Sequence, residues 1–145
     1  MTPAIIERLK AEIPALQRRV YGAAALAAIM KVDGVPTVTP CAHVLPTGLQ
    51  GHPQPSVATG AYVQSIDYGF AVVISLRAHD PNGERMALDE VQPLLEAVAT
   101  ALAGWKPAPT VGVMIFRRAV LASFARGVAI YELDFSLQHQ LRIAR

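Results

Sequence analysis

Few residues could carry chemistry, and none of them follows a known catalytic order. Cys41 and His43 stand two positions apart, so on one strand both would point to the same side and could bind a metal. A tetrahedral zinc site needs four ligands, and the further candidates lack paired-ligand spacing. Those candidates are His52, His79 and His139. The pattern favours a buried thiol and a hydrogen-bonded histidine over a metal site.

Other pairs with catalytic potential have simpler structural explanations. His79 and Asp80 adjoin in HDPNGE, whose Asp, Pro, Asn and Gly are typical turn residues. Glu132 and Asp134 alternate on one strand face and could act as acid and base, but such alternation is more typical of a solvated face. No serine lies in a G-x-S-x-G turn, and there is no Walker loop or dinucleotide glycine fingerprint. An enzyme is therefore disfavoured.

Composition indicates a chain that buries apolar surface against other chains. Of 145 residues, 52% are hydrophobic and 17% are charged, whereas an average soluble domain carries about 25% charged residues. So few charges leave apolar surface uncovered, which favours self-association. The alternative is that many small alanines inflate the apolar count. The length predicts one domain, spanning 1–145.

Charge and cysteine content exclude further classes. The net charge is +2, and the pairs Arg117-Arg118 and Arg18-Arg19 are isolated, whereas a duplex-binding domain shows a clustered basic face. A single cysteine excludes an internal disulfide framework and fits a reducing cytosol. Charged residues interrupt any secretory apolar region near the N-terminus, and no apolar run approaches the roughly 20 residues of a membrane span. We therefore expect no membrane partner.

A long strand must position everything else. In 62–77, YVQSIDYGFAVVISLR, large apolar side chains fall on one parity and small or polar ones on the other. At about 3.3 Å per residue such a strand runs roughly 50 Å, more than twice the usual length. Gly69 is expected to mark a bend or a bulge.

Two amphipathic helices are predicted to cover one face of the sheet that contains this strand. The first starts with Thr2 as its N-cap and ends near Glu12. The second carries apolar residues at a spacing of three or four over 88–102, with Pro93 limiting its start or kinking it. A short alanine-rich helix over 23–30 is expected to pack closely against a neighbour.

Further strands are predicted over 41–45, 111–124 and 128–141, the last two joined by a tight turn at 125–127. The fold class is α+β, with two layers and a mostly antiparallel sheet that has a long central strand and a C-terminal hairpin. Alternate residues of the last strand are polar, which predicts that the second face of the sheet is partly exposed to solvent. Residues 46–60, PTGLQGHPQPSVATG, are expected to form a long protruding loop.

Four segments, taken in order, carry a family resemblance. They are IIERLKAEIPALQRRVYGAAALAA, then HVLPTG with ATGAYVQSIDYGFAVVISLR, then EAVATALAGWKP, and a last hairpin with Tyr131 and Phe135. Together they resemble the phage tail terminator family of Mu-like and related long-tailed phages. LAGWKP and HVLPTG are the most characteristic. The chain departs from the family pattern at Arg117-Arg118 and at Arg126, where small and acidic residues are expected.

The resemblance implies a structural virion protein without cofactors. Members of that family form a ring, typically a hexamer, at the head-proximal end of the tail tube. The ring stops tube polymerisation and offers a surface to the neck proteins of the head, and DNA passes through its lumen. The implied partners are further copies of the chain, the tail tube protein and a neck protein, with no sequence-specific DNA binding. The implied location is the virion tail, after synthesis in the host cytoplasm.

The surfaces that meet these partners can be predicted in outline. The loop has no core of its own and could order on a partner, and the long strand could cross a subunit boundary. The candidate interface residues are Leu49, Gln50, His52, Gln54, Val57, Tyr62, Arg117, Arg118 and Arg126. The alternatives are another head-to-tail joining protein and, from a different class, an α+β small-molecule binding module or enzyme.

Overall fold

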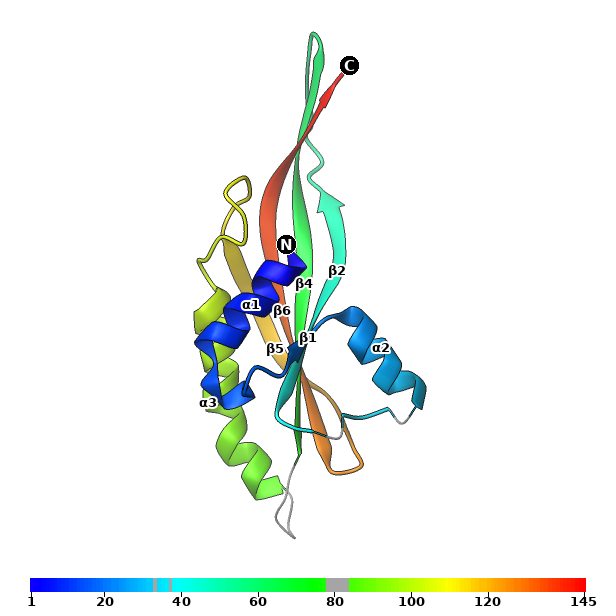
Figure 1. Ribbon diagram of the computed structural model, residues 1–145. Coiled ribbons are helices and arrows are strands. Elements are labelled where there is room, and N and C mark those ends of the chain that lie inside the picture. Colours follow the sequence, from blue (N-terminus) through cyan, green and yellow to red (C-terminus); the bar gives the residue numbers. More distant parts are fainter. Residues whose placement is uncertain (33, 37, 78–83) are drawn as a thin grey trace.

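The computed structural model describes residues 1–32, 34–36, 38–77 and 84–145 (Figure 1). Its elements confirm the α+β class predicted from their order. In chain order they are α1 (Thr2–Glu12), the 3-10 helix η1 (Pro14–Leu16), β1 (Val20–Tyr21), α2 (Ala23–Val32), β2 (Cys41–Gly51), β3 (Ser56–Ala58), β4 (Ala61–Arg77), α3 (Glu84–Leu102), β5 (Met114–Ala125) and β6 (Val128–Ala144). The predicted turn with His79 and Asp80 lies outside the described residues.

One sheet holds the described strands in the order β1-β2-β4-β6-β5, with β3 paired to β4 at its far end. Neighbouring strands are antiparallel, apart from β1 and β2. The central strand β4 pairs with β6 along its whole length, from Ala61 opposite Ala144 to Arg77 opposite Val128. The long central strand and the C-terminal hairpin are therefore confirmed.

The turn between β5 and β6 has two residues, Arg126 and Gly127, with φ values of 54° and 74°. Both lie in the left-handed region, as the turn that best matches the twist of a hairpin requires. Glycine adopts this conformation without steric cost, so Gly127 sets the turn. The tight turn predicted here is confirmed, and β6 continues three residues beyond the predicted end.

The first face of the sheet carries the core, and α1 and α3 cover it (Figure 1). On β4, Phe70 lies opposite Phe135 of β6, and Val72 lies opposite Leu133. The two helices contribute further side chains with no exposed area: Ile5, Leu9, Val98 and Leu102. Because these positions follow the helical and strand periods of the sequence, the core side of the sheet was predictable from it.

The second face of the sheet is partly covered. There α2 packs against β2, on the side away from α1 and α3 (Figure 1). Pro36 and Thr39 also contact the sheet, since Arg77 donates from Nη2 to the Pro36 carbonyl oxygen (3.3 Å) and from its amide to Thr39 Oγ1 (3.2 Å). Along β6, Glu132 and Asp134 stay partly exposed. The second face is thus covered by α2 at the β2 edge and partly exposed to solvent along β6.

The prediction of a long loop over 46–60 is wrong. β2 continues past Leu45 to Gly51, and residues 56–58 form β3, so most of the segment is paired with β4. Beyond His43, β2 is an edge strand, because β1 pairs with only two of its residues. Edge strands tolerate proline, which explains why Pro46 does not end the strand.

Gly69 lies opposite a bulge rather than forming one. Phe70 pairs with Pro46 and Gly69 pairs with Gly48, which leaves Thr47 as the extra residue of β2. A Cβ atom on Gly69 would overlap the Thr47 hydroxyl. The glycine is therefore required by the close approach of the bulged strand, and the predicted irregularity falls on its partner.

Helix boundaries differ from the predictions in small ways. Met1, rather than Thr2, occupies the N-cap position of α1, whose end at Glu12 is confirmed. The third helix begins at Glu84, four residues before the predicted start, so Pro93 lies inside it. The second helix runs to Val32 and packs on β2, but its outward side remains exposed.

Candidate assembly interface

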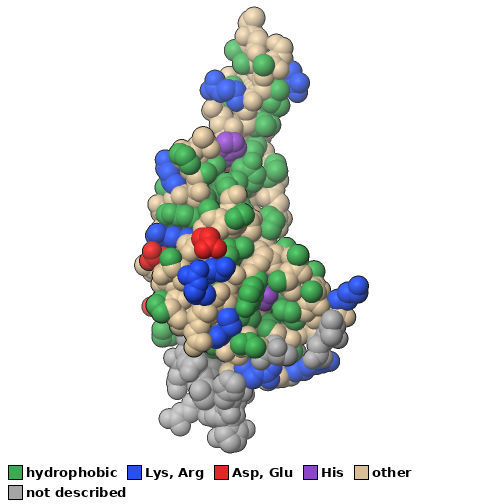
Figure 2. Space-filling view, in the orientation of Figure 1, with side chains coloured by type: hydrophobic (Ala, Val, Ile, Leu, Met, Phe, Trp, Pro, Cys, Tyr) green, Lys and Arg blue, Asp and Glu red, His purple; other side chains and the backbone are tan. Residues whose placement is uncertain are grey.

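Four strands extend beyond the helices as a narrow arm, which we define as residues 49–65 and 138–145 (Figure 1). The structure describes every residue of these two ranges, and none of their side chains is buried. Apolar residues are among the exposed ones, with Val57 exposing 75% of its surface. Figure 2 shows hydrophobic side chains along the arm. The arm therefore presents apolar surface without a core of its own.

Side-chain hydrogen bonds add to the backbone pairing between the end of β2 and β4, where there is no core. Gln64 Nε2 donates to the His52 carbonyl oxygen (2.6 Å), and the Tyr62 hydroxyl donates to Gln64 Oε1 (2.8 Å). His52 Nε2 also lies 3.0 Å from Asp67 Oδ2. These contacts fix the strands relative to one another, so the arm has a defined shape.

The structure gathers most of the predicted interface residues on this arm. Six of the nine lie there: Leu49, Gln50, His52, Gln54, Val57 and Tyr62. Arg117 and Arg118 lie on β5, near the base of the arm. Arg126 occupies the β5–β6 turn, at the opposite end of β6. The prediction thus combined residues from two ends of the sheet.

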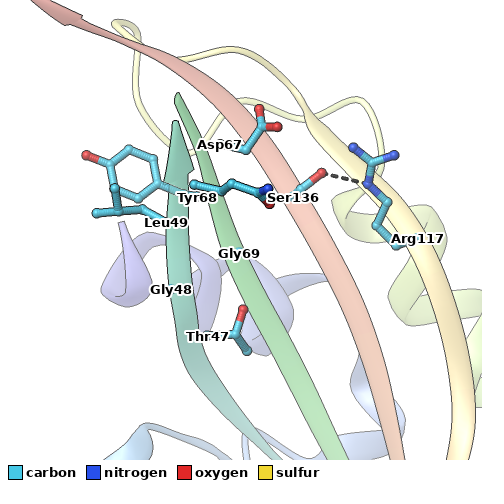
Figure 3. Close-up of a pocket in the computed structure, with 9 residues that line it drawn as sticks. Thr47, Gly48, Leu49, Asp67, Tyr68, Gly69, Arg117 and Ser136 are labelled. Atoms are coloured by element: carbon cyan, nitrogen blue, oxygen red, sulfur yellow. Dashed lines mark hydrogen bonds between the residues drawn. The ribbon is translucent and has the colours of Figure 1, made fainter. Parts of the chain in front are cut away.

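A shallow hollow of about 440 Å³ joins the base of the arm to β5 (Figure 3). Four strands line it, through Thr47, Leu49, Gln50, Asp67, Arg117 and Ser136. Arg117 Nε donates to Ser136 Oγ (2.8 Å), which turns the guanidinium toward β6. The structure therefore brings Arg117 together with Leu49 and Gln50, two residues of the arm that were also predicted to lie at an interface. An open, polar-lined hollow of this kind suits a protein side chain better than an enclosed small molecule.

Arg118 differs from its neighbour because an acid holds it. Its Nε donates to Asp134 Oδ2 (2.9 Å) on β6. This hydrogen bond raises the pKa of the Arg118 guanidinium, with a further contribution from the carboxylate charge. Arg118 is thus already neutralised by a partner within the subunit.

Comparison with known proteins decides the family. A family model described as phage tail terminator protein matches residues 1–145, the whole chain. The chain belongs to the phage tail terminator family. No match was found among curated proteins. Among solved structures, a chain of "Virion of native gene transfer agent (GTA) particle" is similar, with a TM-score of 0.58 and 18% identity, over 97% of this chain and 95% of that one. At this identity the likeness shows a shared fold.

Membership of the terminator family confirms the resemblance drawn from four sequence segments. It makes the chain a structural protein of a phage tail, so the surfaces of interest are those that meet other proteins. Among the residues described, no helix is long and apolar enough to cross a membrane.

Cys41 and His43 share the second face of β2, as their spacing predicted, and both are buried. The His43 ring lies 5.4 Å from that of Tyr21, but within the described residues neither of its nitrogens has a hydrogen-bond partner, which contradicts the predicted hydrogen-bonded histidine. Burial lowers the pKa of His43 and raises that of the Cys41 thiol, because desolvation disfavours the charged form. Within the described part, no three His, Cys, Asp or Glu residues cluster as metal ligands.

Sequence reasoning missed an exposed apolar surface on β5. Leu121 and Phe124 face the side of the sheet that α3 covers, yet they expose 54% and 52% of their surface. The pairing of β5 with β6 shifts between Phe116 and Arg118, and again between Leu121 and Ser123. Each shift reverses the alternation, so a simple parity rule could not assign faces along this strand.

Proposed function

We propose that this chain forms a closed hexameric ring at the head-proximal end of the phage tail tube. The ring stops tube polymerisation, joins the tail to a neck protein of the head, and lets DNA pass through its lumen without sequence-specific binding. The family supports a tail role. The structural observation that carries the proposal is a surplus of accessible surface.

The surplus is large enough to supply a stable interface. The chain exposes 8348 Å². A folded monomer of 15.5 kDa is expected to expose about 7,200 Å². The difference, roughly 1,100 Å², exceeds the roughly 800 Å² that each partner buries in a standard interface. The arm, in which no side chain is buried, adds accessible surface without adding a core, as in a chain that contacts other molecules.

A ring of identical subunits needs two different surfaces on each of them, one meeting the other on the next copy. Such a contact closes into a ring when the rotation that relates neighbouring subunits divides evenly into a full turn. Growth of the tube stops if one side of the ring matches the docking surface of the tube and the other does not. The exposed strands of the arm are suited to either kind of contact, since they carry both apolar side chains and unpaired strand edges.

Mass and symmetry in solution test this function. The purified chain should be examined by light scattering and electron microscopy, alone and with polymerising tail tube protein. We expect particles of about 93 kDa, six times 15.5 kDa, with a central hole, and tubes capped at one end. A chain that stays a 15.5 kDa monomer under both conditions and leaves tube growth unchanged would refute the proposal.

A further inference from the structure

Two exposed apolar surfaces lie at opposite edges of the sheet and on opposite faces of it. The hairpin patch consists of Phe116, Leu121 and Phe124 of β5, on the face that α3 covers. The α2 patch consists of three exposed residues, Tyr21 of β1, Met30 of α2 and Val38, and α2 packs against β2 on the other face (Figure 1). Met30 exposes 64% of its surface. Figure 2 shows hydrophobic side chains at the surface in the region of α2.

Next to the hairpin patch, a hollow of about 270 Å³ opens between α3 and β5. Its lining is Gln92, Leu95, Glu96, Ala99, Phe116 and Ala119. Small-molecule sites usually measure roughly 300–1,000 Å³, so this hollow suits a single protruding side chain better. Methionine is unbranched and adaptable, which fits it for an irregular apolar gap.

We propose that the α2 patch of one subunit docks on the hairpin patch of the next, with Met30 entering the hollow between α3 and β5. This inference rests on the proposed ring and assigns its subunit contact. Because the two patches occupy opposite edges and opposite faces of the sheet, the α2 edge of each subunit would lie over the β5 edge of the next. That arrangement presents the same two surfaces at every contact, as a cyclic ring requires.

Charge complementarity supports a second copy as the occupant. Lys31 follows Met30 directly and is exposed, and the exposed Glu96 stands at the rim of the hollow. Among described residues, neither has an ion-pair partner within its own subunit. When Met30 occupies the hollow, Lys31 comes beside Glu96 of the neighbour.

Charge reversal tests the contact in the full chain. Lys31→Glu and Glu96→Lys, made singly, should each raise the concentration for half-assembly at least tenfold, because like charges then face each other. The double variant should restore assembly to within about threefold of the wild type, since the pair is exchanged but kept. Lys106→Glu is the matched control, an exposed lysine outside both patches. Assembly is read by light scattering, and folding by circular dichroism.

Substitutions in the two apolar patches test the docking without relying on the Lys31–Glu96 pair. Met30→Asp and Leu121→Asp should each abolish the ring while leaving the melting temperature of the monomer within about 2 °C, as exposed substitutions do. Rings that form normally with both variants, or single reversals that the double variant does not rescue, would overturn this docking while the ring itself stands. A wild-type chain that never assembles, with or without tube protein, would overturn both the docking and the proposed function.

Discussion

Replacing Phe135 by alanine is expected to destabilise the fold strongly. The side chain is only 2% exposed, lies opposite Phe70 in the sheet, and holds its ring centroid 5.5 Å from that of Phe116, edge to face. Removing a buried aromatic costs about 3–5 kcal/mol, and the lost ring pair places this case near 4 kcal/mol. In a chain of this length each kcal/mol lowers the melting temperature by about 2–4 °C, so we expect a drop of about 8–16 °C.

Thermal and urea unfolding, followed by circular dichroism at a concentration that keeps the chain monomeric, measure this loss. Phe124→Ala is the matched control, because it removes the same side chain from the neighbouring strand at a position that is 52% exposed. We expect the control to cost less than about 1 kcal/mol. An unchanged melting temperature for Phe135→Ala, or an equal loss of unfolding free energy in the two variants, would refute the burial assigned to the core-facing residues of β6.

Three further predictions follow from the arm, the bulge and the buried histidine. Deleting 50–57, where no side chain is buried, should leave the fold of the core intact but weaken assembly, and fully infectious particles carrying the deletion would contradict this. Gly69→Ala should cost about 1–3 kcal/mol in urea unfolding because its Cβ overlaps the Thr47 hydroxyl, and Thr47→Ala in the same chain should recover most of it. Burial lowers the pKa of His43 in the folded chain, so as the pH falls the unfolded chain binds this proton before the folded chain does. The free energy of unfolding should therefore be constant above about pH 6.5 and decrease below it. His43→Leu should remove this dependence on pH.

The sheet was predictable where side-chain alternation is regular. The parity of residues 62–77 indicated a long strand with one core face, and Phe70, Val72 and Ile74 are buried there as predicted. The amphipathic periods of α1 and α3 likewise indicated which sides face the core. These patterns persist because burial of one face selects side chains at fixed intervals along the chain.

The segment 46–60 was mispredicted because its composition conceals its pairing with β4. Its prolines and glycines are typical of loops, yet β4 provides hydrogen-bond partners for the backbone of β2 and β3. A strand as long as β4 needs neighbours along its whole length, and this requirement, rather than composition, decides the conformation of the segment. The exposure of the arm residues was predictable from their lack of a core, whereas the surface around Leu121 depends on two bulges that no alternation reveals.

The most direct test of the account is an image of the assembled oligomer. Electron microscopy of the purified chain, alone and on tail tubes, should show a six-fold ring with an open centre at one end of each tube. Within that ring, α2 of each subunit should rest against β5 of the next. A stable monomer that binds no tube, or an open filament that does not close, would contradict the claim that this chain ends a tail by forming a ring.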